Sequence, residues 1–286
     1  MDFARIPADW PFRNRMRRVR ARPHDWCVLD VGTGPTVVML HGAGGSGHSF
    51  RHLIPHLARN YRLIVPDLPG QGFSRSGNRG RLGLDGMAED IARLCTAEGV
   101  HPDFAIGHSA GAAVALRLAE IVSLRGIIGI NAALGSFEGA AGIMFPLLAK
   151  VLAVTPFVSQ AVSRMWGTAS TVRRLLASTG SPLEAQGQAQ YLTLVSDSAH
   201  VDGTLAMMAQ WKLDPLLARL PALATPTLLI AAKGDKAVPA RVSRDAAARL
   251  PAARYAELPR YGHLVHEEAA SEVADLILPW MAGLRA

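Results

Sequence analysis

Short apolar segments alternate with segments of helical periodicity through the first half of this chain of 286 residues. Strands are predicted at residues 26–31, 36–40, 61–65, 104–107 and 124–130, and helices at residues 50–59, 86–98 and 110–120. The strands are apolar almost throughout, so both faces of the sheet that they form must be buried. The pattern predicts an α/β protein with a mostly parallel sheet that is covered by helices on both faces.

The alternation is interrupted once. Residues 134–210 show helical patterns and no convincing strand, whereas residues 227–232 and 254–258 are again predicted strands. The insertion leaves and rejoins the chain at the carboxyl ends of strands, where open α/β sheets bind ligands. We therefore predict a core formed by residues 1–133 and 211–286 and a helical cap, or lid, formed by residues 134–210.

The chain is basic, with 30 Lys and Arg against 23 Asp and Glu. Arg18 and Arg20 alternate with apolar neighbours, as in an edge strand whose charge prevents association. No aromatic residues interleave with the arginines of residues 13–20 to stack on nucleic-acid bases. We expect no nucleic-acid partner, while peripheral contact with an acidic partner or a membrane surface stays open.

The cysteines and the apolar segments indicate in which cellular compartment we expect the protein. Cys27 and Cys95 form no C-x-x-C motif, so neither a zinc site nor a disulfide framework is predicted. The first residues lack the apolar region of a signal peptide, and no apolar run reaches the roughly 18 residues of a transmembrane helix. We expect a cytoplasmic protein with no transmembrane segment.

A glycine-rich loop at residues 42–47 follows a predicted strand and satisfies G-x-G-x-x-G, the pattern of a dinucleotide-binding turn. Asp67 follows at about the right distance, but it lies in a Pro-Asp-Leu-Pro-Gly turn and not at a strand tip. The loop also approaches the phosphate-binding pattern, with His48 at the position of the required lysine, which argues against ATP or GTP hydrolysis. The remainder of the chain offers a different explanation for these glycines.

Residues 107–111 form a G-x-S-x-G motif between a predicted strand and a predicted helix. That context is the one in which a nucleophilic serine is held in a tight turn with its hydroxyl exposed above the sheet. The alternative is a purely structural role, in which the serine caps the helix N-terminus and its small neighbours allow close packing. Ser109 is the candidate nucleophile.

A nucleophilic serine needs a base, and the base needs an orienting group. Asp235 and His263 lie in loops that directly follow two later strands, on the same edge of the sheet as Ser109. Their order and placement predict a Ser109, His263, Asp235 triad. His266 is the rival base, but it should lie on the following helix.

The oxyanion of the reaction needs two backbone donors. The N–H of Ala110 follows the nucleophile at a helix N-terminus, and the second donor is expected from the first glycine-rich loop, at Ala43. This interpretation explains the glycines without a nucleotide.

Together these motifs resemble the α/β-hydrolase family across essentially the whole chain. The resemblance is carried by residues 40–42, 66–74, 107–111, 234–239 and 262–263. It implies an eight-stranded, mostly parallel sheet with a helical cap after the sixth strand, and serine chemistry that needs no cofactor. Because members act mostly on esters, amides or carbon–carbon bonds, the fold does not select a substrate.

A narrower resemblance, to the magnesium-chelatase accessory proteins of bacteriochlorophyll biosynthesis, is carried by residues 10–11, 44–51, 107–113, 130–134 and 208–211, together with Arg117. It implies a photosynthetic bacterium, a role near magnesium insertion into protoporphyrin IX, and magnesium-chelatase subunits as partners. Lys212 departs from the pattern, which has an acidic residue there, and puts in doubt any cap contact that relies on that acid.

Residues 140–158 carry one charge, and Pro146 and Pro156 prevent a regular membrane-spanning helix. Either they cover the sheet edge as core or, as we hypothesise, they help to line a large apolar pocket for a flat ligand such as a tetrapyrrole or its ester. Arg164, Arg173 or Arg174 would then pair with ligand carboxylates. The candidate pocket residues are His41, His108, Met144, Phe145, Met165, Trp166, Met208 and Trp211.

The sequence is compatible with two main functions and with a third interpretation. One is a serine hydrolase that cleaves an ester, acyl or carbon–carbon bond of an apolar substrate. The other is a catalytically silent porphyrin-binding or assembly protein on the same scaffold. A cofactor-free lyase or dioxygenase that uses the triad is a third interpretation. No metal-ligand cluster is predicted, and the chain lacks the complete phosphate loop of an ATP-driven chelatase motor.

Overall fold

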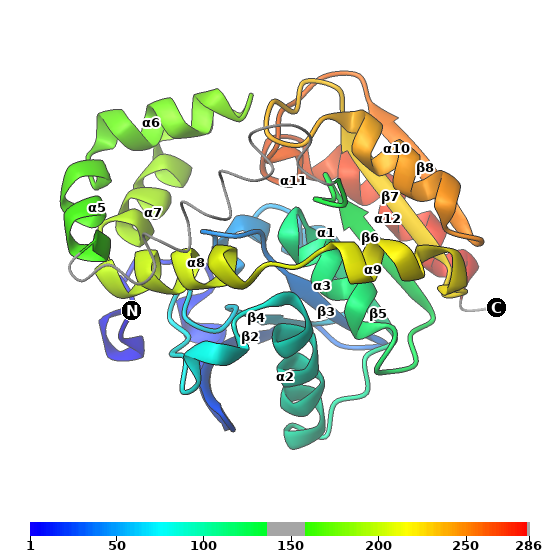
Figure 1. Cartoon of the computed structure of the whole chain (residues 1–286), viewed down its shortest axis with the longest axis horizontal. Coiled ribbons are helices and arrows are strands. Elements are labelled where there is room, and N and C mark those ends of the chain that lie inside the picture. Colours follow the sequence, from blue (N-terminus) through cyan, green and yellow to red (C-terminus); the bar gives the residue numbers. More distant parts are fainter. Residues whose placement is uncertain (136–157, 285–286) are drawn as a thin grey trace.

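The computed structural model describes residues 1–135 and 158–284. Its centre is a sheet of eight strands in the order β1-β2-β4-β3-β5-β6-β7-β8 (Figure 1). The pairs β1–β2 and β2–β4 are antiparallel and the other five pairs are parallel. The strands are β1 Met16–Ala21, β2 His24–Val31, β3 Thr36–Leu40, β4 Arg62–Pro66, β5 Phe104–His108, β6 Gly126–Ile130, β7 Thr227–Ala232 and β8 Ala253–Leu258.

Helices cover both faces of the sheet, as the sequence predicts, and fill the described part of the segment between β6 and β7 (Figure 1). They are α1 Ile54–Leu57, α2 Leu84–Ala97, α3 Ala110–Leu118, α5 Val158–Trp166, α6 Ala169–Ser178, α7 Ala185–Val195, α8 Ser198–Gln210, α9 Asp214–Arg219, α10 Ala240–Arg249, α11 Val265–Glu268 and α12 Ala270–Gly283.

The strands separate two apolar cores. Successive residues of a strand point to opposite faces, so Val38 and Leu40 of β3 enter the core beneath α2, α3 and α10. Val37 and Met39 enter the other core, beneath α1 and α12. The prediction of an eight-stranded, mostly parallel sheet that is buried on both faces is thereby confirmed.

One predicted helix is wrong in its extent. The sequence predicts a single helix over residues 50–59, whereas the structure has a 3₁₀ turn at Gly47–Phe50 and a short α1 at Ile54–Leu57. Pro55 lies in the first turn of α1 and has no N–H to donate to a preceding turn. The α-helix therefore begins just before this residue.

Helices α5 to α8 form a group to one side of the sheet (Figure 1). Within it α5 packs against α8, and α6 packs against α7. The backbone of α8 passes very close to the loop that follows β4. A Cβ on Gly203 of α8 would lie only 1.9 Å from the carbonyl oxygen of Gly70 in that loop. These helices lie within the predicted cap, and the division of the chain into core and cap stays a prediction.

Candidate active site

Ser109 lies in the turn between β5 and α3, with φ 53° and ψ −118°. A non-glycine residue rarely adopts a positive φ, so its surroundings must hold it in this strained conformation. Its N–H donates to the Ile130 carbonyl at 3.0 Å. The flanking glycines are required by space, since a Cβ on Gly107 would lie 2.2 Å from the Gly111 oxygen and one on Gly111 would lie 2.1 Å from the Leu40 oxygen. The half-buried serine therefore has the backbone geometry of a strand-to-helix nucleophile turn.

His263 and Asp235 form a hydrogen-bonded pair at the same edge of the sheet. The distance from His263 Nδ1 to Asp235 Oδ2 is 2.7 Å, and the Asp235 side chain is fully buried. The other carboxylate oxygen accepts the backbone N–H groups of Ala237 and Val238, both at 2.8 Å. A carboxylate held in this way keeps the proton of the imidazole on Nδ1 and leaves Nε2 as the acceptor that a general base requires.

Two buried side chains hold the His263 loop against the turn that carries Ser109. His108 Nε2–H donates to the His263 carbonyl at 2.9 Å, and Asn131 Nδ2 donates to the same oxygen at 2.9 Å. Asn131 Oδ1 in turn accepts the Ala232 N–H at 2.7 Å. Asn131 thus joins the ends of β6 and β7 to the His263 loop. This role of Asn131 is not among the sequence predictions, although a polar residue directly after an apolar strand is the signal that marks it.

The described residues do not include a hydrogen bond between Ser109 and His263. Within residues 1–135 and 158–284, no hydrogen bond joins the Ser109 hydroxyl to the His263 ring. Catalytic hydrogen bonds are often long in ligand-free proteins and tighten in the substrate complex. The His263–Asp235 part of the triad is formed, and the triad as a whole stays a prediction.

The residues that follow α6 bind both the loop that contains Asp235 and the loop that contains His263. The Thr179 carbonyl accepts the N–H of Lys236 at 3.1 Å and the N–H of His263 at 3.2 Å. Ser181 Oγ accepts the Leu264 N–H at 2.8 Å and donates to Glu268. A segment from between β6 and β7 therefore fixes the backbone on either side of the His263–Asp235 pair, a contact that no pattern in the sequence signals.

The two predicted oxyanion donors are available. In the loop at residues 42–47 the Gly44 N–H donates to Gln71 Oε1 at 2.8 Å, and the Gly45 N–H donates to the Gly42 carbonyl at 3.1 Å. The N–H groups of Ala43 and Ala110 have no acceptor in the described part of the chain. A Cβ on Gly42 would lie 3.1 Å from Ser109 Cβ, so the loop closely approaches the nucleophile turn. These observations support Ala43 and Ala110, whose role stays a prediction.

Buried histidines and an aspartate hold this loop in place. His41 Nδ1–H donates to the Gly42 carbonyl at 2.8 Å, and His200 Nε2–H, from α8, donates to the Gly44 carbonyl at 3.1 Å. Burial lowers the pKa of His41 to about 4 and that of His200 to about 3, so both rings are uncharged near neutrality. Asp67, the candidate ribose ligand of the dinucleotide interpretation, accepts the Gly47 N–H at 2.7 Å and is itself buried. Its carboxylate is therefore engaged by the protein's own loop.

His266 differs sharply from His263. It is fully buried on α11, its ring lies 4.2 Å from that of His108, and neither ring nitrogen has a partner among the described residues. Burial, and after it the charges of His263 and Arg51, lower the pKa of His266 to about 3. A ring without solvent access or a hydrogen-bonded acid is a poor general base.

The variant His266→Phe is expected to gain stability over the wild type, and more so in acid. The unfolded chain takes up a proton on this histidine below its ordinary pKa of 6.5, whereas the folded chain does so only near 3. The wild type therefore loses about 2 kcal/mol from this one group between neutrality and about pH 5, which the variant does not lose. Urea unfolding of both proteins at the two pH values measures this. Equal pH dependence would contradict the neutral buried state, and loss of active-site labelling would restore His266 as a candidate base.

The predicted pocket residues lie in three kinds of environment. His41 and His108 are buried, with both ring nitrogens of His41 and Nε2 of His108 hydrogen-bonded to the backbone. Met208 and Trp211 are half-buried at the end of α8, whereas Met165 and Trp166 are 70% and 48% exposed. Met144 and Phe145 lie outside the described residues. The pocket stays a prediction.

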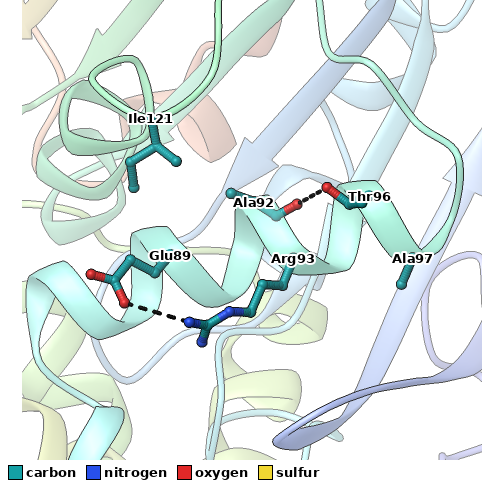
Figure 2. Close-up of a pocket in the computed structure, with 6 residues that line it drawn as sticks. All are labelled: Glu89, Ala92, Arg93, Thr96, Ala97 and Ile121. Carbon is teal, nitrogen blue, oxygen red and sulfur yellow. Dashed lines mark hydrogen bonds and ion pairs between the residues drawn. The ribbon is translucent and has the colours of Figure 1, made fainter.

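A surface hollow on α2, away from the candidate active site, is not lined by any of the candidate catalytic residues. It measures about 430 Å³ and is lined by α2 residues and Ile121, with an ion pair between Glu89 and Arg93 at 3.9 Å (Figure 2). Figure 2 shows an open face of α2 without a paired base and nucleophile. In the described ranges no group of three or more His, Cys, Asp or Glu could hold a metal ion. The helices of those ranges also include none that is both long and apolar enough to span a bilayer.

Known proteins match both the sequence and the fold. Residues 35–270 match the family described as alpha/beta hydrolase fold. The chain is 50% identical to the magnesium-chelatase 30 kDa subunit of Rhodobacter capsulatus over 99% of this chain and all of that one. Among solved structures, the epoxide hydrolase CorEH has a TM-score of 0.79 at 20% identity, covering 94% of this chain and 99% of that one. An esterase of Thermogutta terrifontis has a TM-score of 0.75 at 23% identity, covering 94% and 100%.

Proposed function

The chain belongs to the α/β-hydrolase family, and from that premise we propose that it is a serine hydrolase with Ser109 as nucleophile, His263 as base and Asp235 as the orienting acid. Its substrate is an apolar molecule with a cleavable ester, acyl or carbon–carbon bond. The reaction needs no cofactor. Two observations carry the proposal: Ser109 is strained, at φ 53°, in the turn that follows β5, and an imidazole in a loop after β8 is already paired with a buried carboxylate at 2.7 Å.

The proposed reaction on an ester runs in two halves. Ser109 Oγ attacks the carbonyl carbon while His263 Nε2 takes the hydroxyl proton, and the N–H groups of Ala43 and Ala110 stabilise the oxyanion. The C–O bond to the leaving alcohol then breaks as His263 returns the proton to that oxygen. Water, deprotonated by the same nitrogen, then attacks the acyl carbon, and the bond to Ser109 Oγ breaks as His263 gives that oxygen the proton, which releases the acid and the free serine. Each backbone donor contributes about 3 to 4 kcal/mol when it is correctly aimed.

We further propose that the enzyme acts in bacteriochlorophyll biosynthesis near the magnesium-chelatase step, on a tetrapyrrole or its ester and in contact with magnesium-chelatase subunits. The support is the 50% identity to the Rhodobacter capsulatus protein of that name. The cap of residues 134–210 would cover the substrate. Two buried, unpaired cysteines, Cys27 and Cys95, are consistent with work in the cytoplasm.

A fluorophosphonate probe tests the proposal. Ser109 Oγ would form a bond to phosphorus and displace fluoride, so the wild-type protein is expected to gain the mass of one probe on the peptide that contains Ser109. Tandem mass spectrometry locates the adduct, and a known serine hydrolase serves as the positive control. An unmodified Ser109 beside a fully labelled control would remove the hydrolase proposal.

A second function, a catalytically silent porphyrin-binding or assembly protein, is favoured by two observations. The 50% identical relative is named as a chelatase subunit, and the described residues have no hydrogen bond from Ser109 to His263. Under this alternative the Ser109→Ala variant restores pigment formation to a strain that lacks the protein. Under the hydrolase proposal the variant fails to do so while the wild type succeeds.

A further inference from the structure

Helices α5 and α6, at one edge of the molecule, expose large apolar side chains (Figure 1). Met165 is 70% exposed, Trp166 48% and Leu175 40%. In the described part of the chain only one other large hydrophobic residue, Ile121, is as exposed as these. We define the α5–α6 corner as these three residues together with the exposed arginines of the same two helices: Arg164, Met165, Trp166, Arg173, Arg174 and Leu175.

The corner carries positive charge that no carboxylate of the described residues neutralises. Arg164, Arg173 and Arg174 have no carboxylate partner among the described residues, although Arg174 donates to Thr171 Oγ1 at 3.4 Å. The sequence contains no Asp or Glu from residue 139 to residue 183. The acids of the neighbouring helices have other partners: Glu184 pairs with Arg51, and Asp202 pairs with Arg79. Asp197 accepts the His200 N–H at the start of α8 and lies 3.7 Å from the N-terminal amine.

The rest of α6 explains why these side chains stay outside. Val172 and Leu176 form its buried face and pack with Leu183 and Leu264. With that face already covered, the corner is a second surface, which exposes its side chains among the residues that the structure describes and lies at the edge of the molecule (Figure 1). Tryptophan close to exposed arginines, as at Trp166 and Arg164 of α5, is the composition of a segment that lies in a bilayer interface.

We propose that the α5–α6 corner binds the surface of an anionic membrane, with Trp166, Met165 and Leu175 entering the headgroup layer and the three arginines contacting acidic lipid headgroups. The fluid interface accommodates side chains that protrude from an edge, whereas a folded acidic protein would need a pocket shaped for each of them. Each arginine near such a surface strengthens partitioning about fivefold.

This surface is connected to the candidate active site through α6. The helix ends directly before Thr179, whose carbonyl binds the N–H groups of Lys236 and His263. An apolar substrate dissolved in a membrane would therefore meet the protein one helix away from its base. Membrane binding itself does not depend on whether Ser109 reacts.

Vesicle sedimentation of the full chain tests the proposal. The wild type is expected to sediment with phosphatidylcholine vesicles that contain about one third phosphatidylglycerol, less with pure phosphatidylcholine, and less in about 0.5 M NaCl. Arg164→Gln/Arg173→Gln/Arg174→Gln should weaken partitioning roughly a hundredfold. Met165→Ser/Trp166→Ser should weaken it at every salt concentration. Circular dichroism and thermal melting verify that each variant is folded.

A charge-matched control separates this surface from the overall positive charge. Arg15→Gln/Arg22→Gln/Arg254→Gln removes three other exposed arginines, from the N-terminal region and β8, and should leave partitioning within about fivefold of wild type. Absence of wild-type sedimentation, equal losses in both triple variants, or binding only to an acidic protein partner would each overturn the proposal. Ser109→Ala should sediment as the wild type does, so failure of the hydrolase proposal is distinguishable from failure of this one.

Discussion

Replacing Ser109 with alanine is expected to abolish fluorophosphonate labelling and to lower ester hydrolysis by about 10⁴- to 10⁶-fold. The substitution removes the atom that forms the covalent bond in the proposed mechanism and leaves the proposed Ala43 and Ala110 donors in place. The protein should remain folded, because the main-chain bonds of residue 109 to Ile130 and Ala133 do not involve the hydroxyl. Initial rates on a short-chain aryl ester measure the loss.

Glycine at the same position provides a matched control for the strain. Ser109→Gly is equally inactive, but glycine adopts φ 53° without the cost that a Cβ brings. Its free energy of unfolding should therefore exceed that of Ser109→Ala by about 1 kcal/mol. Urea unfolding compares the two. Equal stabilities would contradict the strained conformation, and residual hydrolysis in either variant would point to another nucleophile.

The sheet could be predicted from the sequence because its inner strands are buried on both faces. Continuous apolar runs such as residues 36–40 and 227–232 match β3 and β7 residue for residue. The loops that follow such strands meet at one edge of a parallel sheet, and this is why Ser109, Asp235 and His263 could be proposed together from their positions alone. The pairing of His263 with Asp235 needed only this topology.

The supports of the site could not be predicted in the same way. The Thr179 carbonyl and the His108 ring act through backbone contacts across large sequence separations, and backbone acceptors leave no mark on residue type. Met165 and Trp166 show a different limit of the sequence pattern. Their apolar character predicts a pocket, whereas whether such a residue faces inward depends on which face of α5 is already packed, and both are exposed. Helical periodicity gives the face but not its partner.

The buried side chain of Arg51 forms ion pairs that join the start of α7 to α11, the helix that follows His263. Arg51 is 6% exposed and binds Glu267 of α11 and Glu184 at the start of α7, the latter at 2.6 Å. Tyr191 of α7 donates to the remaining Glu267 oxygen at 2.7 Å. Burial raises the pKa of Glu267 to about 7, against the lowering effect of Arg51. The charge of Glu267 in the folded protein therefore depends on Arg51.

Arg51→Met is accordingly expected to cost about 3 to 5 kcal/mol of stability at about pH 8, because it leaves an uncompensated carboxylate in the interior. Without the arginine the pKa of Glu267 rises further above its ordinary value of 4.5. A carboxyl with a raised folded pKa contributes full stability below the unfolded value and loses it as the pH rises. The deficit should therefore shrink towards about pH 5, where Glu267 is protonated. Urea unfolding at three pH values measures it.

Two further variants decide whether the charge or the packing is responsible. Arg51→Met/Glu267→Gln removes both charges and keeps an acceptor for Tyr191, so it should recover at least half of the loss and show little pH dependence. Arg62→Met breaks a half-exposed pair with Asp30, at 2.7 Å, and should cost no more than about 1 kcal/mol. If Arg51→Met were no more harmful than Arg62→Met, Glu267 would have water or another cation as its partner. In that case α7 would be held to the core by apolar packing, and the cap could leave the site without breaking a charge pair.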